Sequence, residues 1–171
     1  MTTRPILPFG DPILRKTARP VTEWNDRLSR LLDDLGETLY AAEGRAGLAA
    51  PQIGILRRVI VMDCGDGLIE LVNPVIIERS GEQYGTEGCL SYPGYYGKVK
   101  RSEQVKLTTM DRSGALRELE ASGYLARCIQ HEIDHLDGIL YIDHIQNGEL
   151  YFNQTDQPAS LYDIQRRTRK N

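Results

Sequence analysis

The chain has 171 residues, a length that suits one compact domain with its own hydrophobic core. Hydrophobic residues make up 40% and charged residues 26%, and the formal net charge of −3 gives no reason to expect DNA or membrane binding. There is no membrane-length apolar run and no export signal at the N-terminus, and the cysteines number three, so we expect a cytoplasmic protein with reduced thiols.

The first predicted element is a helix over residues 25–43, because leucines recur there at helical spacing. Asn25 is placed to cap its start and Gly44 to end it. The middle of the chain then changes character, and three segments rich in β-branched residues are predicted to be strands: 57–63, 68–77 and 103–111. The tetrapeptide DRSG at 111–114 predicts a turn between two antiparallel strands.

Helical spacing returns over residues 121–136, with Ser122 as a possible N-cap and Gly138 as the stop. The tail after about residue 147 is polar, and we expect it to pack loosely. The elements together predict a single α+β domain over residues 1–171. A mostly antiparallel sheet would pack around a central helix that carries the sequence HEIDH, with another helix near the N-terminus.

Two histidines stand four residues apart on this central helix, with a glutamate directly after the first. On a helix, His131 and His135 lie one above the other, with Cβ atoms roughly 5–6 Å apart, so both imidazoles can reach one cation. Glu132 is rotated by about 100° around the helix, where it can hold the water that a metal activates. Because the chain has only three histidines, the pattern favours a metal site over two surface residues.

The third ligand is not evident downstream of the two histidines. Known zinc-peptidase patterns would place a histidine at the position of Tyr141, or would use a later glutamate. His144 lies beyond the glycine stop and is expected at the surface, and Glu149 lies in the polar tail.

An upstream candidate is Cys89, which lies in the glycine-rich segment 85–94. Gly88 would allow the backbone to approach a metal closely, and a thiolate would add a negative charge to the cation. Taken alone, a cysteine is more often a small buried hydrophobe, and this interpretation is kept for Cys64 and Cys128.

Three motifs in order resemble those of the peptide deformylase family: GLAAPQ (47–52), EGCLS (87–91) and HEIDHLDG (131–138). The resemblance runs from about residue 11 to 142. It implies that Cys89, His131 and His135 hold one divalent metal ion and leave a fourth position to water. The implied metal is Fe²⁺, with Zn²⁺, Ni²⁺ or Co²⁺ able to substitute.

The resemblance also implies an activity, the hydrolysis of the formyl group from N-formylmethionyl nascent peptides with release of formate. Glu132 would act as general base. The side-chain amide of Gln52 and the backbone N–H of Leu90 would meet the developing oxyanion. Glu87 and Arg101 would form a buried ion pair that holds the loop of Cys89 in place.

Helical spacing predicts part of the substrate pocket, because residues three, four and seven positions before His131 share its face. Cys128 and the ring of Tyr124 are expected to line a methionine pocket. Arg127 is expected to lay its stem against the pocket and turn its charged head toward solvent. By resemblance, Gly47 pairs through its backbone with the extended substrate. The expected substrate-binding residues are therefore Gly47, Ala46, Tyr124, Arg127 and Cys128.

One position departs from the family pattern, which usually has a glycine where this chain has Arg45. The substrate groove is therefore expected to differ in shape or charge at its entrance. We expect a monomer that binds neither membrane nor a specific DNA sequence. The basic run 166–170 is interpreted as a solvated end, with contact to the ribosome near the exit tunnel as the alternative. A zinc endopeptidase and a non-catalytic binder of peptide N-termini remain the competing functions.

Overall fold

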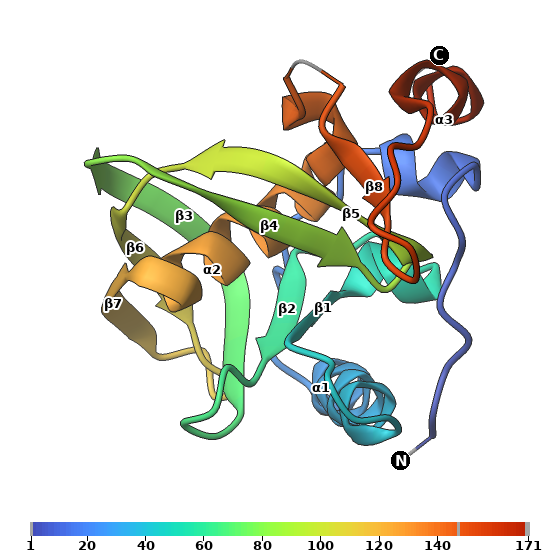
Figure 1. Ribbon diagram of the computed structural model, residues 1–171. Helices are drawn as coiled ribbons and strands as arrows, with labels where there is room; N and C mark the ends of the chain where they lie inside the picture. The colour runs from blue at the N-terminus through green and yellow to red at the C-terminus, as the bar shows by residue number, and fades with distance from the viewer. Residues whose placement is uncertain (1, 147, 170–171) are drawn as a thin grey trace.

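The computed structural model describes residues 2–146 and 148–169. Its strands, shown in Figure 1, are β1 (Gly47–Ala49), β2 (Val59–Met62), β3 (Ile69–Ser80), β4 (Gln83–Cys89), β5 (Tyr92–Arg101), β6 (Gln104–Met110), β7 (Leu116–Ser122) and β8 (Leu150–Phe152). The α-helices are α1 (Asp26–Tyr40), α2 (Gly123–Leu136) and α3 (Leu161–Arg167). Short 3₁₀ turns are η1 (Pro12–Arg15), η2 (Ala50–Ile53) and η3 (Tyr141–His144).

The strands form two sheets, one in the order β1-β2-β3-β6-β7 and the other in the order β4-β5-β8. Every pairing between these named strands is antiparallel. Helix α2 runs through the middle of the molecule, between the five-stranded sheet and strands β4 and β5 (Figure 1). The predicted α+β domain with a central helix is therefore confirmed.

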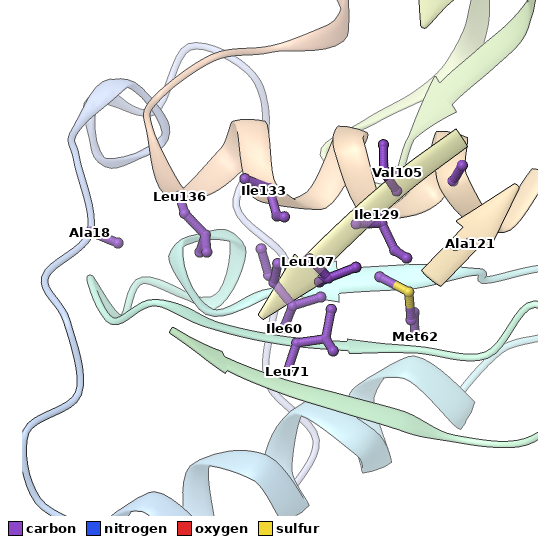
Figure 2. Close-up of a cluster of buried hydrophobic side chains, with 12 residues drawn as sticks. Ala18, Ile60, Met62, Leu71, Val105, Leu107, Ala121, Ile129, Ile133 and Leu136 are labelled. Atoms are coloured by element: carbon purple, nitrogen blue, oxygen red, sulfur yellow. The ribbon is translucent and has the colours of Figure 1, made fainter. Parts of the chain in front are cut away.

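The rotation of α2 is set by its apolar side. Ile129, Ile133 and Leu136 recur at helical spacing and pack on the five-stranded sheet (Figure 2). Their partners from β2 and β3 are Ile60, Met62 and Leu71. Each fully buried side chain of this size contributes about 1.5–3 kcal/mol relative to leaving it in water. Holding this side against the sheet directs the histidines of α2 toward β4.

Helix α1 begins where its cap was predicted, because the Asn25 side chain accepts from the backbone N–H groups of Arg27 and Leu28 at 3.1 and 3.2 Å. It ends at Tyr40, earlier than predicted. Gly44 is therefore not its stop; it lies in the following loop with φ of +77°. The buried leucines of α1 pack on β1 and β2 and form a second apolar cluster.

The start and stop of α2 lie close to the predicted positions. Ser122 occupies the N-cap position, but its side chain makes no capping hydrogen bond. Gly138 follows the helix with φ of +71°, and a Cβ there would collide with the backbone of Arg15. None of the helices in the described part of the chain is both long and apolar enough to span a membrane.

The predicted strands at 57–63, 68–77 and 103–111 correspond to β2, β3 and β6, and the turn at 111–114 joins β6 to β7. The tail packs more closely than expected. Strand β8 pairs with β5, and Leu150, Ile164 and Thr168 are buried. In the basic run, Arg166 and Arg167 are exposed and Thr168 is buried; its last residue, at position 170, lies outside the described residues.

Candidate active site

Cys89 lies more than 40 residues before the two histidines in the sequence, but the three side chains meet in the centre of the molecule. The nearest ligand atoms of Cys89, His131 and His135 all lie within 4.8 Å of one another, and the Cys89 Sγ is 3.4 Å from His135 Nε2. The histidines lie one turn apart on α2. Cys89 ends β4, where the register with β5 shifts after Glu87. Two imidazoles and one thiol form a donor set that suits zinc or ferrous iron, so these residues fit the expected metal.

The downstream alternatives for a third ligand lie outside this cluster. The Nε2 atom of His144 is 2.8 Å from the Asp134 carboxylate, and this histidine is half-buried rather than fully exposed. The Tyr141 ring stacks on His131 with centroids 6.0 Å apart. Across residues 2–146 and 148–169, the Cys-His-His cluster is the one group of three or more such side chains close enough to share an ion.

A buried carboxylate orients the first histidine. Glu87 accepts a hydrogen bond from His131 Nδ1 at 2.7 Å, so the Nε2 atom of that ring is left free for a metal. The same carboxylate accepts two hydrogen bonds from Arg101, each of 2.8 Å. Burial alone would raise the pKa of Glu87, but the hydrogen bonds from Arg101 and His131 outweigh it and hold that pKa well below its ordinary value. Glu87 is therefore ionised, and the expected pairing of Glu87 with Arg101 is present.

Arg127 does not lie as predicted. Its side chain is only 5% exposed, and its guanidinium donates to Glu87 at 2.6 Å and to the Val99 carbonyl at 3.0 Å. The expectation of a head turned toward solvent is therefore wrong. Helix α2 is covered by β4 and β5 at this point, and their acceptors draw the charged group inward. Arg127 still lines the cleft, but its polar atoms support Glu87.

Glu132 lies against the edge strand β1. Its side chain is buried, and one carboxylate oxygen, Oε2, has no hydrogen-bond partner among the described residues. Burial is the main reason why the pKa of Glu132 is raised to about 7. A Cβ atom at Gly47 would lie 2.8 Å from Oε1 of Glu132. The Glu132 carboxylate can therefore occupy this position only because Gly47 has no side chain.

We expect Gly47→Ala to lower kcat/KM by about 10²-fold for any reaction that uses the Glu132 carboxylate, because the new methyl group forces that carboxylate aside. The obstructed atoms belong to a flexible side chain, so the melting temperature should change little. Gly36→Ala is the matched control, because a Cβ there makes only an ordinary contact of 3.7 Å with Leu68. Steady-state kinetics and thermal unfolding of both variants test this expectation. Unchanged kinetics in Gly47→Ala would contradict it.

The Gln52 side chain is fixed on both sides. Its Oε1 accepts from the backbone N–H of Ala49 at 3.0 Å, which leaves the amide nitrogen pointing at the metal cluster. That nitrogen lies 3.1 Å from Ser91 Oγ and 3.6 Å from Cys89 Sγ. The Gln52 amide therefore lies beside the thiol, and Leu90, the next residue after Cys89, also lines the cleft.

A cleft of about 700 Å³ opens onto this cluster. The free edges of β1 and β4 form its two walls, and α2 forms its floor. The expected substrate-binding residues all line it: Ala46, Gly47, Tyr124, Arg127 and Cys128. Cys128 is buried, and the neighbouring Cys64 thiol, together with this burial, raises the pKa of Cys128.

Several residues of the site were given no role in the sequence analysis. Ser91 holds Gln52, and Asp134 joins Arg101 at 2.6 Å to His144. Asp134 lies within the HEIDH sequence, so its position beside the histidines was the available signal. Arg4 and Tyr95 also line the cleft. They approach it from the N-terminal segment and from β5, and only the fold brings them there.

Comparison with known proteins gives one consistent result. The model of the polypeptide deformylase family matches residues 3–150. The chain is 51% identical over 145 residues to a peptide deformylase of Caldanaerobacter subterraneus subsp. tengcongensis, covering 85% of this chain and 91% of that relative. It is 52% identical over 147 residues to a peptide deformylase of Heliobacterium modesticaldum, covering 86% and 97%.

Solved structures agree. The crystal structure of peptide deformylase from Thermotoga maritima aligns with a TM-score of 0.83 and 42% identity, over 85% of this chain and 99% of that one. The crystal structure of peptide deformylase from Thermus thermophilus aligns with a TM-score of 0.80 and 46% identity, over 84% and 86%.

Proposed function

The chain belongs to the polypeptide deformylase family, and from this membership we propose that Cys89, His131 and His135 hold one divalent metal ion beside Glu132 as general base. The enzyme removes the formyl group from the N-terminal methionine of newly made polypeptides and releases formate. The observation that supports the assignment most strongly is the convergence of a thiol and two imidazoles within 4.8 Å, next to a buried carboxylate with an unpartnered oxygen.

A divalent ion in this site would supply Lewis acidity, lowering the pKa of water to about 7 and polarising the formyl carbonyl. Glu132 takes the proton of the attacking water through its unpartnered oxygen and then delivers a proton to the leaving amine. Gln52 and the Leu90 backbone N–H stabilise the oxyanion that develops on the formyl oxygen; losing one such donor typically costs about 10²–10³ in rate. Glu87 keeps His131 in the tautomer and orientation that this arrangement requires.

The free edge of β1 is the proposed binding site for the substrate backbone. Asp63 donates its N–H to the Ala46 carbonyl at 2.8 Å, so the backbone polar groups of Ala46 face β2. Hydrogen-bonding direction alternates along an antiparallel strand, so the N–H and C=O of Gly47 face the cleft. An extended peptide can add to this edge as a further strand, with its methionine side chain between Tyr124 and Cys128. Such pairing uses only main-chain atoms of the substrate, so it accepts many sequences after the methionine.

The finer assignments extend this proposal. The cellular metal is Fe²⁺, and Zn²⁺, Ni²⁺ or Co²⁺ can replace it, because imidazole and thiolate ligands suit all four. The enzyme works as a monomer in the cytoplasm, on nascent chains near the ribosome.

A purified sample reconstituted anaerobically with Fe²⁺ or Ni²⁺ should release formate from formyl-Met-Ala-Ser. Cys89→Ala should lose both bound metal and formate release, because it removes one of three ligands. Cys64→Ala is the control and should retain both, since Cys64 is not part of the ligand cluster. Metal analysis and formate detection measure these outcomes. Internal cleavage of unformylated peptides that persists in Cys89→Ala would instead favour an endopeptidase.

A further inference from the structure

The entrance of the cleft carries an arginine where the family pattern has a glycine. Arg45 is half-buried, lies between Gly44 and Ala46, and lines the cleft directly beside the β1 edge. Gly44 is exposed, and a Cβ there would meet nothing within 4 Å. Arg45 therefore lies at the solvent end of the cleft, beside the C-terminal end of α1.

The charged residues around this opening do not all form ion pairs. The acidic residues that line the cleft are Glu87 and Glu132, and both are buried deep within it. Arg4 also lines the cleft, but it is neutralised by two hydrogen bonds of 3.0 and 2.8 Å to Asp34. Arg45 donates one N–H to the Thr38 carbonyl at the end of α1, and it forms no ion pair with any carboxylate in the described ranges. Of the three arginines that line the cleft in the described ranges, Arg45 alone forms no ion pair, although Glu43 and Asp63 line the adjoining hollow.

The course of β1 sets which part of a substrate meets this charge. The reacting group must lie at Gly47, because the Glu132 carboxylate is packed against that residue. Beyond Gly47 in one direction, Leu48, Ala49 and Ala50 are completely buried, so no chain can leave that way. The open direction runs back toward Arg45, two residues or roughly 6–7 Å along an extended strand. The second or third residue of the substrate reaches this point.

We propose that Arg45 makes this deformylase prefer formylated peptides with an acidic side chain at the second or third residue over those with a basic one. The preference rests on the proposed function, because it assumes that the substrate pairs with the β1 edge. A solvent-exposed ion pair is worth about two- to fivefold in binding. The preference is therefore of that size at low ionic strength, and it is weakened by salt.

The test compares kcat/KM for formyl-Met-Ala-Glu-amide and formyl-Met-Ala-Lys-amide, together with the pair formyl-Met-Glu-Ser-amide and formyl-Met-Lys-Ser-amide. The C-terminal amides remove the free carboxylate, which would otherwise also attract Arg45. In the metal-loaded enzyme the glutamate peptide of at least one pair should be favoured about two- to fivefold. Arg45→Gln should bring that ratio close to one, and Arg45→Lys should keep most of it. Arg30→Gln is the matched control, because it removes the same charge from the exposed side of α1, away from the cleft.

The possible failures are distinguishable. If formyl-Met-Ala-Ser releases no formate from a metal-loaded sample, the proposed function itself fails. If that peptide is deformylated but glutamate and lysine peptides react equally in both pairs, the role of Arg45 is refuted while the function stands. A glutamate preference that survives in Arg45→Gln would also overturn the role of Arg45. A loss of preference in Arg30→Gln would attribute it to net charge rather than to this position.

Discussion

Replacing Glu132 with glutamine is expected to lower kcat/KM for formyl-Met-Ala-Ser by roughly 10²–10⁴-fold, the usual contribution of a positioned general base. The amide keeps the shape of the side chain beside Gly47 but cannot take the proton of the attacking water. Burial already raises the pKa of Glu132 to about 7, which shows that the site disfavours the ionised form. A neutral glutamine should therefore not lower the melting temperature.

Three measurements on Glu132→Gln make this expectation specific. Metal content should match that of the wild type, because Glu132 is not one of the three clustered ligands. The variant should still bind formylated peptides, so that it competes with the wild-type enzyme for a limiting amount of substrate. If the metal-loaded variant keeps more than about a tenth of the activity, another group must take the proton and the assignment of Glu132 as base is wrong.

The largest effect on stability is expected at Glu87. In Glu87→Gln the buried carboxylate that accepts from His131, Arg101 and Arg127 loses its charge. Arg101 keeps one carboxylate partner, Asp134 at 2.6 Å, whereas Arg127 is left with neutral acceptors. Removing one partner from a buried ion network typically lowers the free energy of unfolding by about 3–5 kcal/mol. Urea unfolding of the metal-loaded protein at pH 7 measures this.

The matched control is Glu78→Gln, which removes a carboxylate that is 71% exposed and 4.0 Å from Lys106. Its free energy of unfolding should change by less than about 1 kcal/mol. The pH dependence supplies a second check. The pKa of Glu87 is lower in the folded protein than in the unfolded chain, where it is about 4.3, so its stabilisation is complete above that pH. As the pH falls below about 4.3, the difference between wild type and Glu87→Gln should shrink. A difference that grows instead would contradict an ionised Glu87.

The helices and three of the strands follow patterns that the sequence displays openly. The leucines of α1 and the isoleucines of α2 recur at helical spacing, and β2, β3 and β6 are rich in β-branched residues. Strands β4 and β5 were not predicted because glycines interrupt them, and glycine normally signals turns and weakens strands. Here the glycines serve close packing. A Cβ at Gly85 would lie 3.2 Å from the Arg127 guanidinium, and one at Gly97 would collide with Ile145.

In the candidate site, too, features set by neighbouring residues were predictable, whereas contacts between residues far apart in the sequence were not. The spacing of His131 and His135 is local and was sufficient to predict a two-histidine metal site. The partner of Arg127 is Glu87, which lies 40 residues away on another element, so no local pattern indicated that this guanidinium would be buried. The three-residue difference in the end of α1 has a similar cause, because the loop that follows must turn into β1 at the cleft. Element types were therefore more predictable than the ion pairs that join elements.

The two free strand edges that line the cleft have a consequence for when the enzyme can act. An unpaired edge is normally a liability, because it can recruit strands from other molecules. Here the edges of β1 and β4 line one and the same cleft. A chain inserted between them satisfies both walls only if both of its own backbone sides are still unpaired. A strand already built into a sheet has given up at least one side, so the cleft admits an N-terminus only while that segment is unpaired. Free backbone hydrogen-bonding groups, as in a chain that has not yet folded, are therefore a condition for entry.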